Sequence, residues 1–437
     1  MTYSRLSGCL RMSRSFSIPR LAWFIVFLVG VPAIESGCAT NLFSGMFGRQ
    51  DTKLTKGPFL LGVYPDRAAL MWETQTEGPC KLYYGRDGKL DKYIESVPQT
   101  NQVNGEPVKK LAFIHKVWLE GLDAGRLYDY RVTGPGFENK IYRFRTVPKK
   151  TDEVRFIVYG DSRTRPSVHR RLVKLMKKQN VDFVVHCGDL VTKGGKYEQW
   201  GPQFFVPLKG LAETVPVYVA KGNHDGNDID CGNFEKLLMP EGRKNSFGFD
   251  FGPVHYFCAD NVTEGLKDDV QLELIIADAG ASGARWKFVS YHIPSLNFGG
   301  HWSAWGYPDA LPGLSEAGVD FVLAGHSHLY EHFRPVAPAD GADGSYVTYI
   351  TSGGGGMFIH GIKPNVYHAT AKKKHHFCLF SIKGSKLTVD TIGIDGRVID
   401  HIEVIKQAGR LDEKYLRSAI PMKELLAFQQ MNLYRRD

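Results

Sequence analysis

The sequence VDFVLA at residues 319–324 runs directly into GHSH at residues 325–328. Its apolar residues predict a short buried strand, and the glycine that follows allows the backbone to turn sharply. Open α/β sheets bind their ligands beyond the carboxyl ends of their strands, and neutral imidazole is a common ligand of divalent transition metals. His326 and His328 are therefore candidate metal ligands, although an H-x-H pair alone is also typical of ordinary loops.

Four other buried strands are predicted in the same part of the chain. They are RFIVYG at 155–160, VDFVVH at 181–186, VPVYVA at 215–220 and WKFVSY at 286–291. Residues that can bind metal follow each of them within three positions: Asp161, Asp189, Asn223 and His292. A single Gly-Asp pair is usually a turn. Five such ends in one sheet, with oxygen and nitrogen donors and no thiolate, predict a metal site.

The pattern of predicted strands and helices divides the chain into two domains. Strands alternate with helical segments such as 167–179 over residues 153–405, which predicts an α/β domain. Over residues 57–147, short runs of branched and aromatic residues are separated by Gly, Pro and Asp, which predicts an all-β sandwich. Residues 409–437 form a charged tail that we expect to be helical, with a break at Pro421.

Residues 1–37 have the features of an export segment. Four arginines precede the apolar run at 21–31, which is too short to span a bilayer comfortably. Gly37-Cys38 resembles a bacterial lipoprotein processing site with Cys38 as the acylated residue, although Glu35 departs from that pattern. A cleaved signal and an uncleaved membrane anchor are the alternatives. All three predict an extracytoplasmic protein, either periplasmic, secreted or anchored to a membrane.

Charge and cysteine content exclude some classes of protein. The formal net charge is +9, and the first 37 residues, with four arginines and one glutamate, account for +3 of it. The remainder forms no concentrated basic stripe, so no dedicated nucleic-acid binding is expected. The seven cysteines are scattered and include no C-x-x-C, which argues against a disulfide framework or a zinc finger. They remain compatible with one disulfide, and Cys187 is expected to be a small buried residue.

The order of these motifs (GD, GD, GNHD, H, GHxH) resembles that of the calcineurin-like metallophosphoesterase superfamily. With the β-sandwich in front, the chain is similar to purple acid phosphatase-like enzymes from about residue 57 to about residue 404. Residues 115–132 resemble the late strands of a fibronectin type III-like domain, with Tyr128 and Tyr130 packed in its core and one hydrogen bond to the turn. The implied fold is an N-terminal all-β sandwich followed by an α/β phosphoesterase domain, in which packed sheets are flanked by helices.

The resemblance implies two metal ions, drawn from Fe, Mn and Zn, at the strand ends. Their protein ligands would be Asp161, Asp189, Asn223, His292, His326 and His328. Asp189 would bridge the two ions. Asp161 and His328 would bind only the first, and the other three residues only the second. His224 would face the phosphoryl group and assist the leaving oxygen, Asp225 would orient His224, and His301 would face the substrate.

The sequence departs from the family pattern in two places. Most relatives have D-x-H or D-x-G where this chain has Asp161-Ser162-Arg163, and purple enzymes have a tyrosine where this chain has Thr192. The first metal therefore retains three protein ligands, which makes Mn, Zn or ferrous iron as plausible there as ferric iron. Arg163 is always protonated and cannot bind a metal, so we expect its forked donors to bind a phosphate oxygen.

The expected function is hydrolysis of phosphate esters, most directly monoesters, by an exported enzyme. The resemblance implies in-line attack of a metal-bound hydroxide on phosphorus. Phosphodiester hydrolysis on the same scaffold is one alternative, because loop shape rather than motif sets that choice. A catalytically weak surface binding protein is another. An enzyme acting on nucleic acid is a third, which the modest charge disfavours.

Overall fold

The computed structural model describes residues 54–102, 110–226, 232–263, 268–301, 310–337, 346–425 and 427–428. The predicted export segment and Cys38 lie outside these residues. Within them, no helix is both long enough and apolar enough to cross a membrane. The cysteines at 80, 187, 258 and 378 are free and buried, as expected for Cys187.

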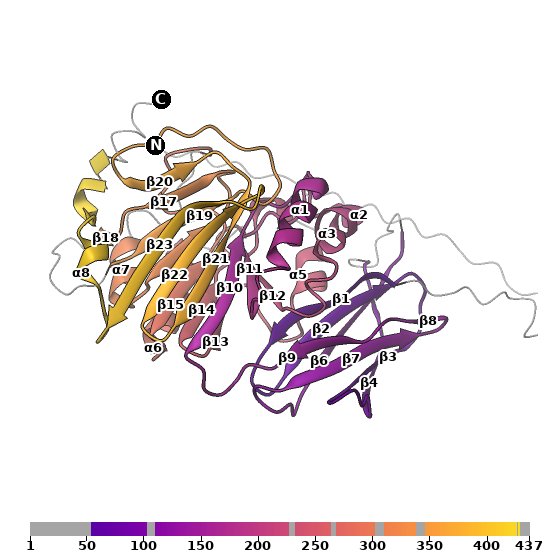
Figure 1. The fold of residues 1–437 in the computed structure, drawn as a ribbon. Helices are drawn as coiled ribbons and strands as arrows, with labels where there is room; N and C mark the ends of the chain where they lie inside the picture. The colour runs from indigo at the N-terminus through magenta and orange to yellow at the C-terminus, as the bar shows by residue number, and fades with distance from the viewer. Residues whose placement is uncertain are drawn as a thin grey trace, which may run out of the picture. The chain divides into compact units, whose positions relative to one another are not determined.

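The N-terminal domain is the expected all-β sandwich, drawn in indigo to purple in Figure 1. One sheet has the order β1–β2–β6–β5, formed by Leu54–Val63, Ala68–Thr74, Phe113–Leu119 and Gln99–Thr100. The other has the order β4–β3–β7–β8, formed by Lys92–Ser96, Cys80–Gly85, Leu127–Gly134 and Phe137–Glu138, and β9 (Tyr142–Arg145) also pairs with β7. All pairings are antiparallel, so each strand can present one face to the shared core.

Tyrosine hydroxyls join the sandwich to its turn and to the domain that follows. Tyr128 Oη accepts the backbone N–H of Asp123 at 2.8 Å, which is the predicted bond to the turn. Tyr130 Oη donates to the carbonyl of Glu213 at 2.7 Å, and Tyr218 Oη donates to the carbonyl of Val63 at 2.9 Å. Because these two bonds run in opposite directions between buried groups, they tie the two domains together at separate points.

The second domain contains two seven-stranded mixed sheets. The first has the order β12–β11–β10–β21–β22–β23–β24, formed by Val217–Val219, Phe183–His186, Glu153–Tyr159, His376–Lys383, Lys386–Gly393, Val398–Gln407 and Arg410–Leu411. The second has the order β13–β14–β15–β16–β19–β17–β20, formed by Phe247–Phe251, Val254–Cys258, Trp286–Ser290, Phe321–Ala324, Thr348–Ser352, Tyr330–Phe333 and His368–Lys372. The prediction that all five ligand-bearing strands share one sheet is therefore wrong. Three lie in the first sheet and two in the second.

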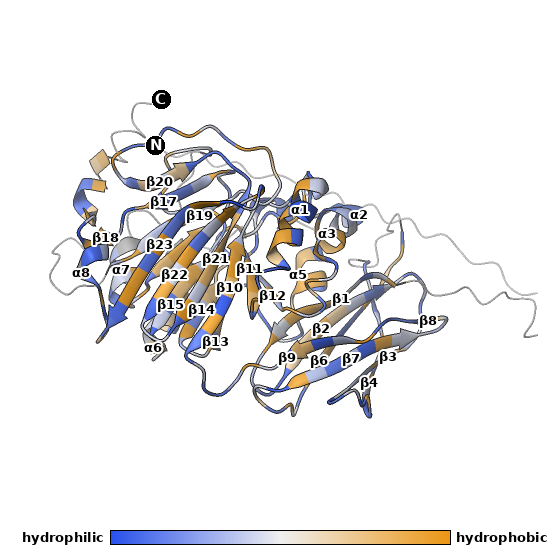
Figure 2. Cartoon of the chain, viewed as in Figure 1, coloured by the Kyte–Doolittle hydropathy of each residue, from blue (hydrophilic) through white to orange (hydrophobic). Residues whose placement is uncertain are grey.

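Aromatic side chains hold the two sheets together. Phe156 of the first sheet meets Phe288 and Tyr256 of the second edge-on, with ring centroids 5.1 and 5.8 Å apart. Within its own sheet, Phe156 stacks on Phe183 and Phe380 at 4.7 Å. Figure 2 shows the apolar colour concentrated on these central strands. Aromatic pairs at such distances contribute beyond the area they bury, so the sheets are fixed face to face.

Helices cover the outer surfaces of the sheets. The helix α1 (Pro166–Met176), predicted over 167–179, buries Leu172 and Met176 in the same core as the first sheet. The helices α6 (Asp268–Ala281) and α7 (Ala310–Glu316) contribute Ile275 and Leu314 to a second core with residues of β15 and β16. The smaller elements are α2 (Tyr197–Trp200), the π-helix η1 (Gly201–Phe205), α3 (Val206–Leu208), α4 (Asn223–Gly226), α5 (Asn233–Leu238), β18 (Val336–Ala337), α8 (Glu413–Leu416) and β25 (Ile420–Pro421).

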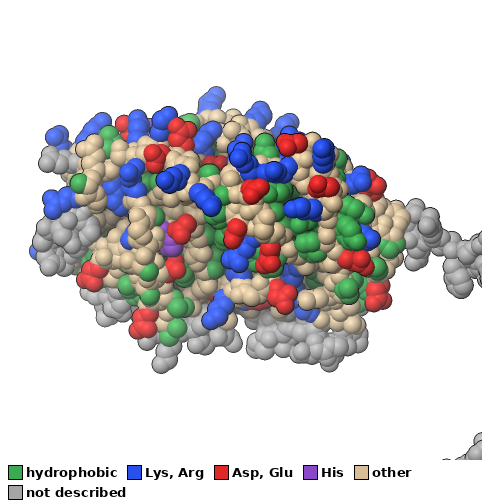
Figure 3. All heavy atoms as spheres, turned by 90° about the horizontal axis from the view of Figure 1, so that it is seen from below, with side chains coloured by type: hydrophobic (Ala, Val, Ile, Leu, Met, Phe, Trp, Pro, Cys, Tyr) green, Lys and Arg blue, Asp and Glu red, His purple; other side chains and the backbone are tan. Residues whose placement is uncertain are grey.

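The start of the predicted charged tail is packed against the domain. Strand β24 extends the first sheet, α8 follows it, and β25 pairs in parallel with β18. Ile420, Met422 and Leu425 are buried in the second core. The prediction of a helical tail is therefore only partly correct, because these apolar side chains draw the chain back onto the sheet. Elsewhere on the surface, Lys and Arg side chains are interspersed with Asp and Glu on the face seen in Figure 3.

A buried imidazole joins the β13–β14 hairpin to α6. His255 Nδ1 lies 2.8 Å from Asp250 Oδ1, and Nε2 lies 2.7 Å from Asp278 Oδ2. Burial by itself lowers the pKa of an imidazole, but hydrogen bonds to the two carboxylates prevail and raise the pKa of His255 to about 9. The pKa of a histidine in the unfolded chain is 6.5. The protonated His255 therefore contributes fully to stability below pH 6.5, and this contribution is lost as the pH rises through about 9.

We predict that His255→Gln lowers the free energy of unfolding by about 1–2 kcal/mol at pH 6, with a smaller loss above pH 9. Thermal unfolding of both proteins across this pH range is the measurement. His401→Gln is the matched control, because His401 pairs with Asp390 at 2.7 Å on the exposed surface of β23. If His255→Gln lowered the free energy of unfolding equally at pH 6 and pH 10, the protonated imidazole would not be the source of the stabilisation.

Candidate metal centre and active site

The ends of five strands meet at one edge of the packed sheets. Asp161 follows β10, Asp189 follows β11, and Asn223 begins α4 just after β12. These three strands pair in parallel, so their carboxyl ends lie side by side. His292 follows β15 and His326 follows β16, which also pair in parallel in the second sheet. The site is therefore assembled from both sheets, and neither sheet supplies it alone.

Three of these residues adopt left-handed backbone conformations. The φ angles are 59° for Asp161, 61° for Asp189 and 66° for His326. Non-glycine residues in this region are uncommon and cost of order 1–3 kcal/mol when the surroundings hold them there. The backbone N–H of Asp161 donates to the carbonyl of Gly188 at 3.0 Å, and that of His326 donates to Asp161 Oδ2 at 2.8 Å. The strained turns are therefore stabilised by bonds within the site itself.

Four donor atoms converge at the position expected for the second metal. His292 Nε2 lies 2.9 Å from Asn223 Oδ1 and 3.3 Å from Asp189 Oδ1. His326 Nδ1 lies 3.0 Å from Asn223 Oδ1 and 3.3 Å from His292 Nε2. Donor atoms at such separations are those of a coordination shell with bonds of about 2.0–2.2 Å. The mixed oxygen and nitrogen set suits Mn, Fe or Zn.

The protonation of the imidazoles also fits a metal ligand. Burial lowers the pKa of His292, and it lowers those of His326 and His328 to about 2, so all three rings are neutral. His292 Nδ1 must donate its proton to the carbonyl of Cys187, which lies 2.8 Å away. The lone pair of His292 therefore resides on Nε2, facing the other donors, as bound histidines require.

The position expected for the first metal already contains a cation. Arg163, only 5% exposed, donates from Nε to Asp189 Oδ2 at 2.9 Å, and its Nη2 lies 3.4 Å from His328 Nε2. Asp161 Oδ1 lies 3.5 Å from His328 Nε2 and has no hydrogen-bond partner among the described residues. Burial and the neighbouring Asp189 carboxylate raise the pKa of Asp161. The expectation that Arg163 binds phosphate is thus replaced by an ion pair with Asp189.

His224 is held by backbone groups. Its N–H donates to Asp189 Oδ1 at 2.9 Å, and its Nδ1 donates to the carbonyl of Thr192 at 2.8 Å. This arrangement leaves Nε2 as the ring nitrogen able to meet a substrate. The expectation that Asp225 orients this ring is wrong, because the carbonyl of Thr192 does so.

Asp225 instead organises the loops beneath the site. Its buried carboxylate accepts backbone N–H groups at 2.8–3.3 Å, namely those of Asp189, Leu190, Val191 and Gly222. A carboxylate with four such donors is a structural anchor for the ends of β11 and β12. Sequence reasoning missed this role because the four donors are backbone groups, which no residue pattern marks.

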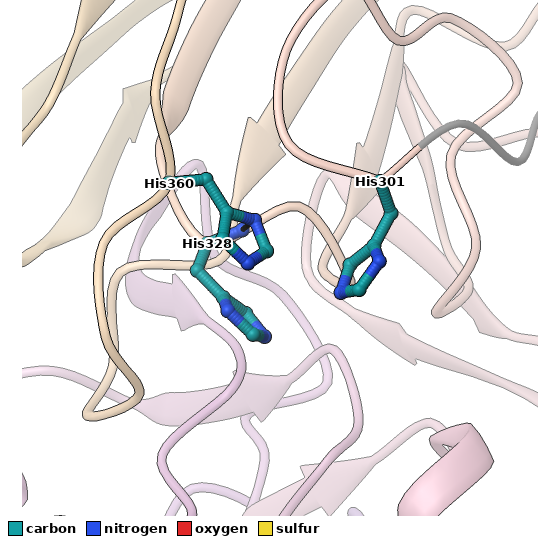
Figure 4. Close-up of side chains that lie close together, drawn as sticks. All are labelled: His301, His328 and His360. Atoms are coloured by element: carbon teal, nitrogen blue, oxygen red, sulfur yellow. Dashed lines mark hydrogen bonds between the residues drawn. The ribbon is translucent and has the colours of Figure 1, made fainter.

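A cluster of three histidines lies at the rim of the site (Figure 4). His301, His328 and His360 each have a ring nitrogen within 4.8 Å of the others. His301 also lies over His326, with centroids 4.4 Å apart, so the structure places it at the site as expected. His360 was not predicted. It lies four residues beyond the glycine run 353–356 that follows β19, the neighbour of β16, and this placement is the signal that could have indicated it.

Parts of the chain are similar to known proteins. Residues 154–330 match the family model described as calcineurin-like phosphoesterase. Purple acid phosphatase 21 of Arabidopsis thaliana is 30% identical over 261 residues, which cover 56% of this chain and 58% of that protein. Probable inactive purple acid phosphatase 1 of the same plant is 24% identical over 325 residues, covering 59% and 52%. The chain thus spans about half the length of these curated relatives.

A solved structure shares the fold across both domains. The purple acid phosphatase from yellow lupin (Lupinus luteus) seeds superposes with a TM-score of 0.67 at 18% identity, covering 85% of this chain and 76% of that one. Residues 154–330 therefore form a calcineurin-like phosphoesterase domain, and the chain is similar to purple acid phosphatases in sequence and fold.

Proposed function

We propose that the chain is a metal-dependent hydrolase of phosphoric esters, and of monoesters in particular. The observation that carries this proposal is the convergence of four donors beside His224, those of Asp189, Asn223, His292 and His326. When bound there, a divalent metal supplies Lewis-acid charge and lowers the pKa of a coordinated water. The name of one relative, purple acid phosphatase 21, supports a monoester substrate.

His224 is the residue that we assign to the leaving group. Its Nδ1–H is held by the carbonyl of Thr192, and its N–H is held by Asp189 Oδ1. In the imidazolium form this ring carries a proton at Nε2, which it can give to the departing oxygen. The same positive charge stabilises a phosphoryl group that gains negative charge in the transition state.

His301 and His360 are proposed to contact the phosphoryl group from the rim. The His360 ring accepts the backbone N–H of His328 at Nδ1, 3.1 Å away, so the neutral ring carries its proton on Nε2. His301 stands 4.7 Å from His360, ring centroid to centroid, across the cluster. N–H groups in these positions can bind phosphate oxygens without adding charge.

We also propose that the protein acts outside the cytoplasm. The support is the sequence of residues 1–37, in which arginines precede a short apolar run, and Cys38, a candidate for lipid attachment. Either lipidation or an uncleaved segment would anchor the folded domains to a membrane.

The full chain, loaded separately with Mn²⁺, Zn²⁺ and Fe²⁺, should hydrolyse p-nitrophenyl phosphate faster than bis(p-nitrophenyl) phosphate. Steady-state rates with and without added metal are the measurement. Faster turnover of the bis-ester would make the chain a phosphodiesterase. Folded, metal-loaded protein that hydrolyses neither compound would contradict the proposed function and favour a binding protein.

Asp189→Ala should lose bound metal and activity together, because Asp189 contacts the donors of the second position and positions His224. We expect metal affinity to fall by more than about 100-fold, because mutation of a residue that only hydrogen-bonds to a metal ligand already lowers metal affinity 10–100-fold. Metal content after dialysis is measured beside circular dichroism. Asp390→Ala, within β22, where Asp390 pairs with the exposed His401, is the control. Full retention of metal by Asp189→Ala would refute the ligand assignment.

His224→Ala should keep its metal and lower kcat by about 10²–10⁴-fold, the usual contribution of a general acid. The loss should be larger for phenyl phosphate than for p-nitrophenyl phosphate, because the poorer leaving group depends more on the proton. Kinetics on both esters and metal content are the measurements, with His401→Ala as the control. Equal losses on both esters would contradict a role in protonating the leaving group.

A further inference from the structure

Arg163 is bound to the atoms that a first metal ion would use. Its guanidinium donates to Asp189 Oδ2 at 2.9 Å and lies 3.4 Å from His328 Nε2. Two of the three protein ligands expected for that metal therefore face the guanidinium. A metal bound to Asp189 Oδ2 at about 2.2 Å would lie within about 5 Å of Arg163 Nε, and repulsion between such cations is strong in a buried site.

We infer that the guanidinium of Arg163 takes the place of the first metal ion, so that the chain binds one metal ion and not two. The geometry of Asp189 agrees with one ion. Its Oδ2 accepts a hydrogen bond from the guanidinium of Arg163, and its Oδ1 faces His292 at the second position. A buried charge is tolerated when it is paired, and Asp189 Oδ2 already has its cation in Arg163.

The backbone fixes Arg163 in this position. Its N–H donates to the carbonyl of Asp189 at 3.2 Å, and its carbonyl accepts the N–H of Arg165 at 2.8 Å. The next residue, Thr164, has a φ of 71°, and its hydroxyl lies 2.9 Å from that of Thr192. The two residues that depart from the family pattern, Arg163 and Thr192, are therefore joined through Thr164 in one hydrogen-bonded loop.

Thr192 does not replace the missing tyrosine as a ligand. Its hydroxyl lies 3.0 Å from Gln203 Oε1 as well as 2.9 Å from the Thr164 hydroxyl, and its N–H donates to the same glutamine oxygen at 2.8 Å. The Thr192 side chain thus stabilises the loop through these hydrogen bonds. One oxygen of Asp161, Oδ2, accepts the N–H of His326.

The three histidines at the rim do not provide a displaced first site. His360 Nδ1 accepts the N–H of His328, and the His328 and His360 rings are tilted by 31° with their centroids 4.0 Å apart (Figure 4). Nitrogens of the three rings lie within 4.8 Å of one another, but the neutral His360 ring uses its Nδ1 lone pair for this hydrogen bond and carries its proton on Nε2, so it has no lone pair left for an ion. Metal ligation needs convergent, deprotonated nitrogens.

The test is the number of Mn²⁺ ions that the full chain retains after saturation and desalting, measured by mass spectrometry of the metal. The expected result is one per chain, with the six-line electron paramagnetic resonance spectrum of an isolated Mn²⁺. Arg163→His removes the cation and adds an imidazole, so it should retain two ions with a spin-coupled spectrum. Arg165→His, two residues along on the same loop, should retain one.

Two Mn²⁺ ions in the unaltered chain, or a spin-coupled spectrum from it, would overturn the inference. One ion in a folded Arg163→His protein would also overturn it, because removal of the cation would then not open a second position. If that variant does not fold, the count in the unaltered chain decides alone. The count needs no turnover, so an inactive protein with one Mn²⁺ would contradict the proposed function and leave this inference standing.

Discussion

The buried carboxylate of Asp225 is the interaction on which the geometry of the site depends. Its two oxygens accept backbone N–H groups from both loops that follow β11 and β12, those of Asp189, Leu190, Val191 and Gly222. One side chain therefore sets where Asp189, Asn223 and His224 stand. Burying a carboxylate is costly unless its oxygens are satisfied, and four donors meet that condition.

The packing of the two sheets supplies the rest of the site. His292 and His326 come from the second sheet, and they meet Asp189 and Asn223 of the first because aromatic side chains such as Phe156 hold the sheets in register. The carbonyl of Cys187, on the first sheet, fixes the tautomer of His292 on the second. The coordination shell is therefore preorganised by contacts that cross the interface between sheets.

Charge explains why the two halves of the centre differ. The second position presents neutral imidazoles and an amide oxygen around one carboxylate oxygen, which requires a cation from solution. At the first position, the other oxygen of Asp189 already has a cation from the chain itself, in Arg163. A guanidinium is permanent and does not exchange, so the same fold can support a centre with fewer ions.

The sequence by itself determined the two domains and the residues that stand at the strand ends, because apolar runs mark buried strands and glycines mark sharp turns after them. All six expected ligands, His224 and His301 do lie at the site. Tertiary structure alone decided that the strands divide between two sheets and that Asp225 accepts hydrogen bonds from backbone N–H groups. It also decided that Arg163 pairs with Asp189 and that His360 lies beside His301 and His328. These outcomes depend on contacts between residues far apart in the chain, such as Phe156 with Phe288, and on the direction of side chains. No local pattern encodes either of them.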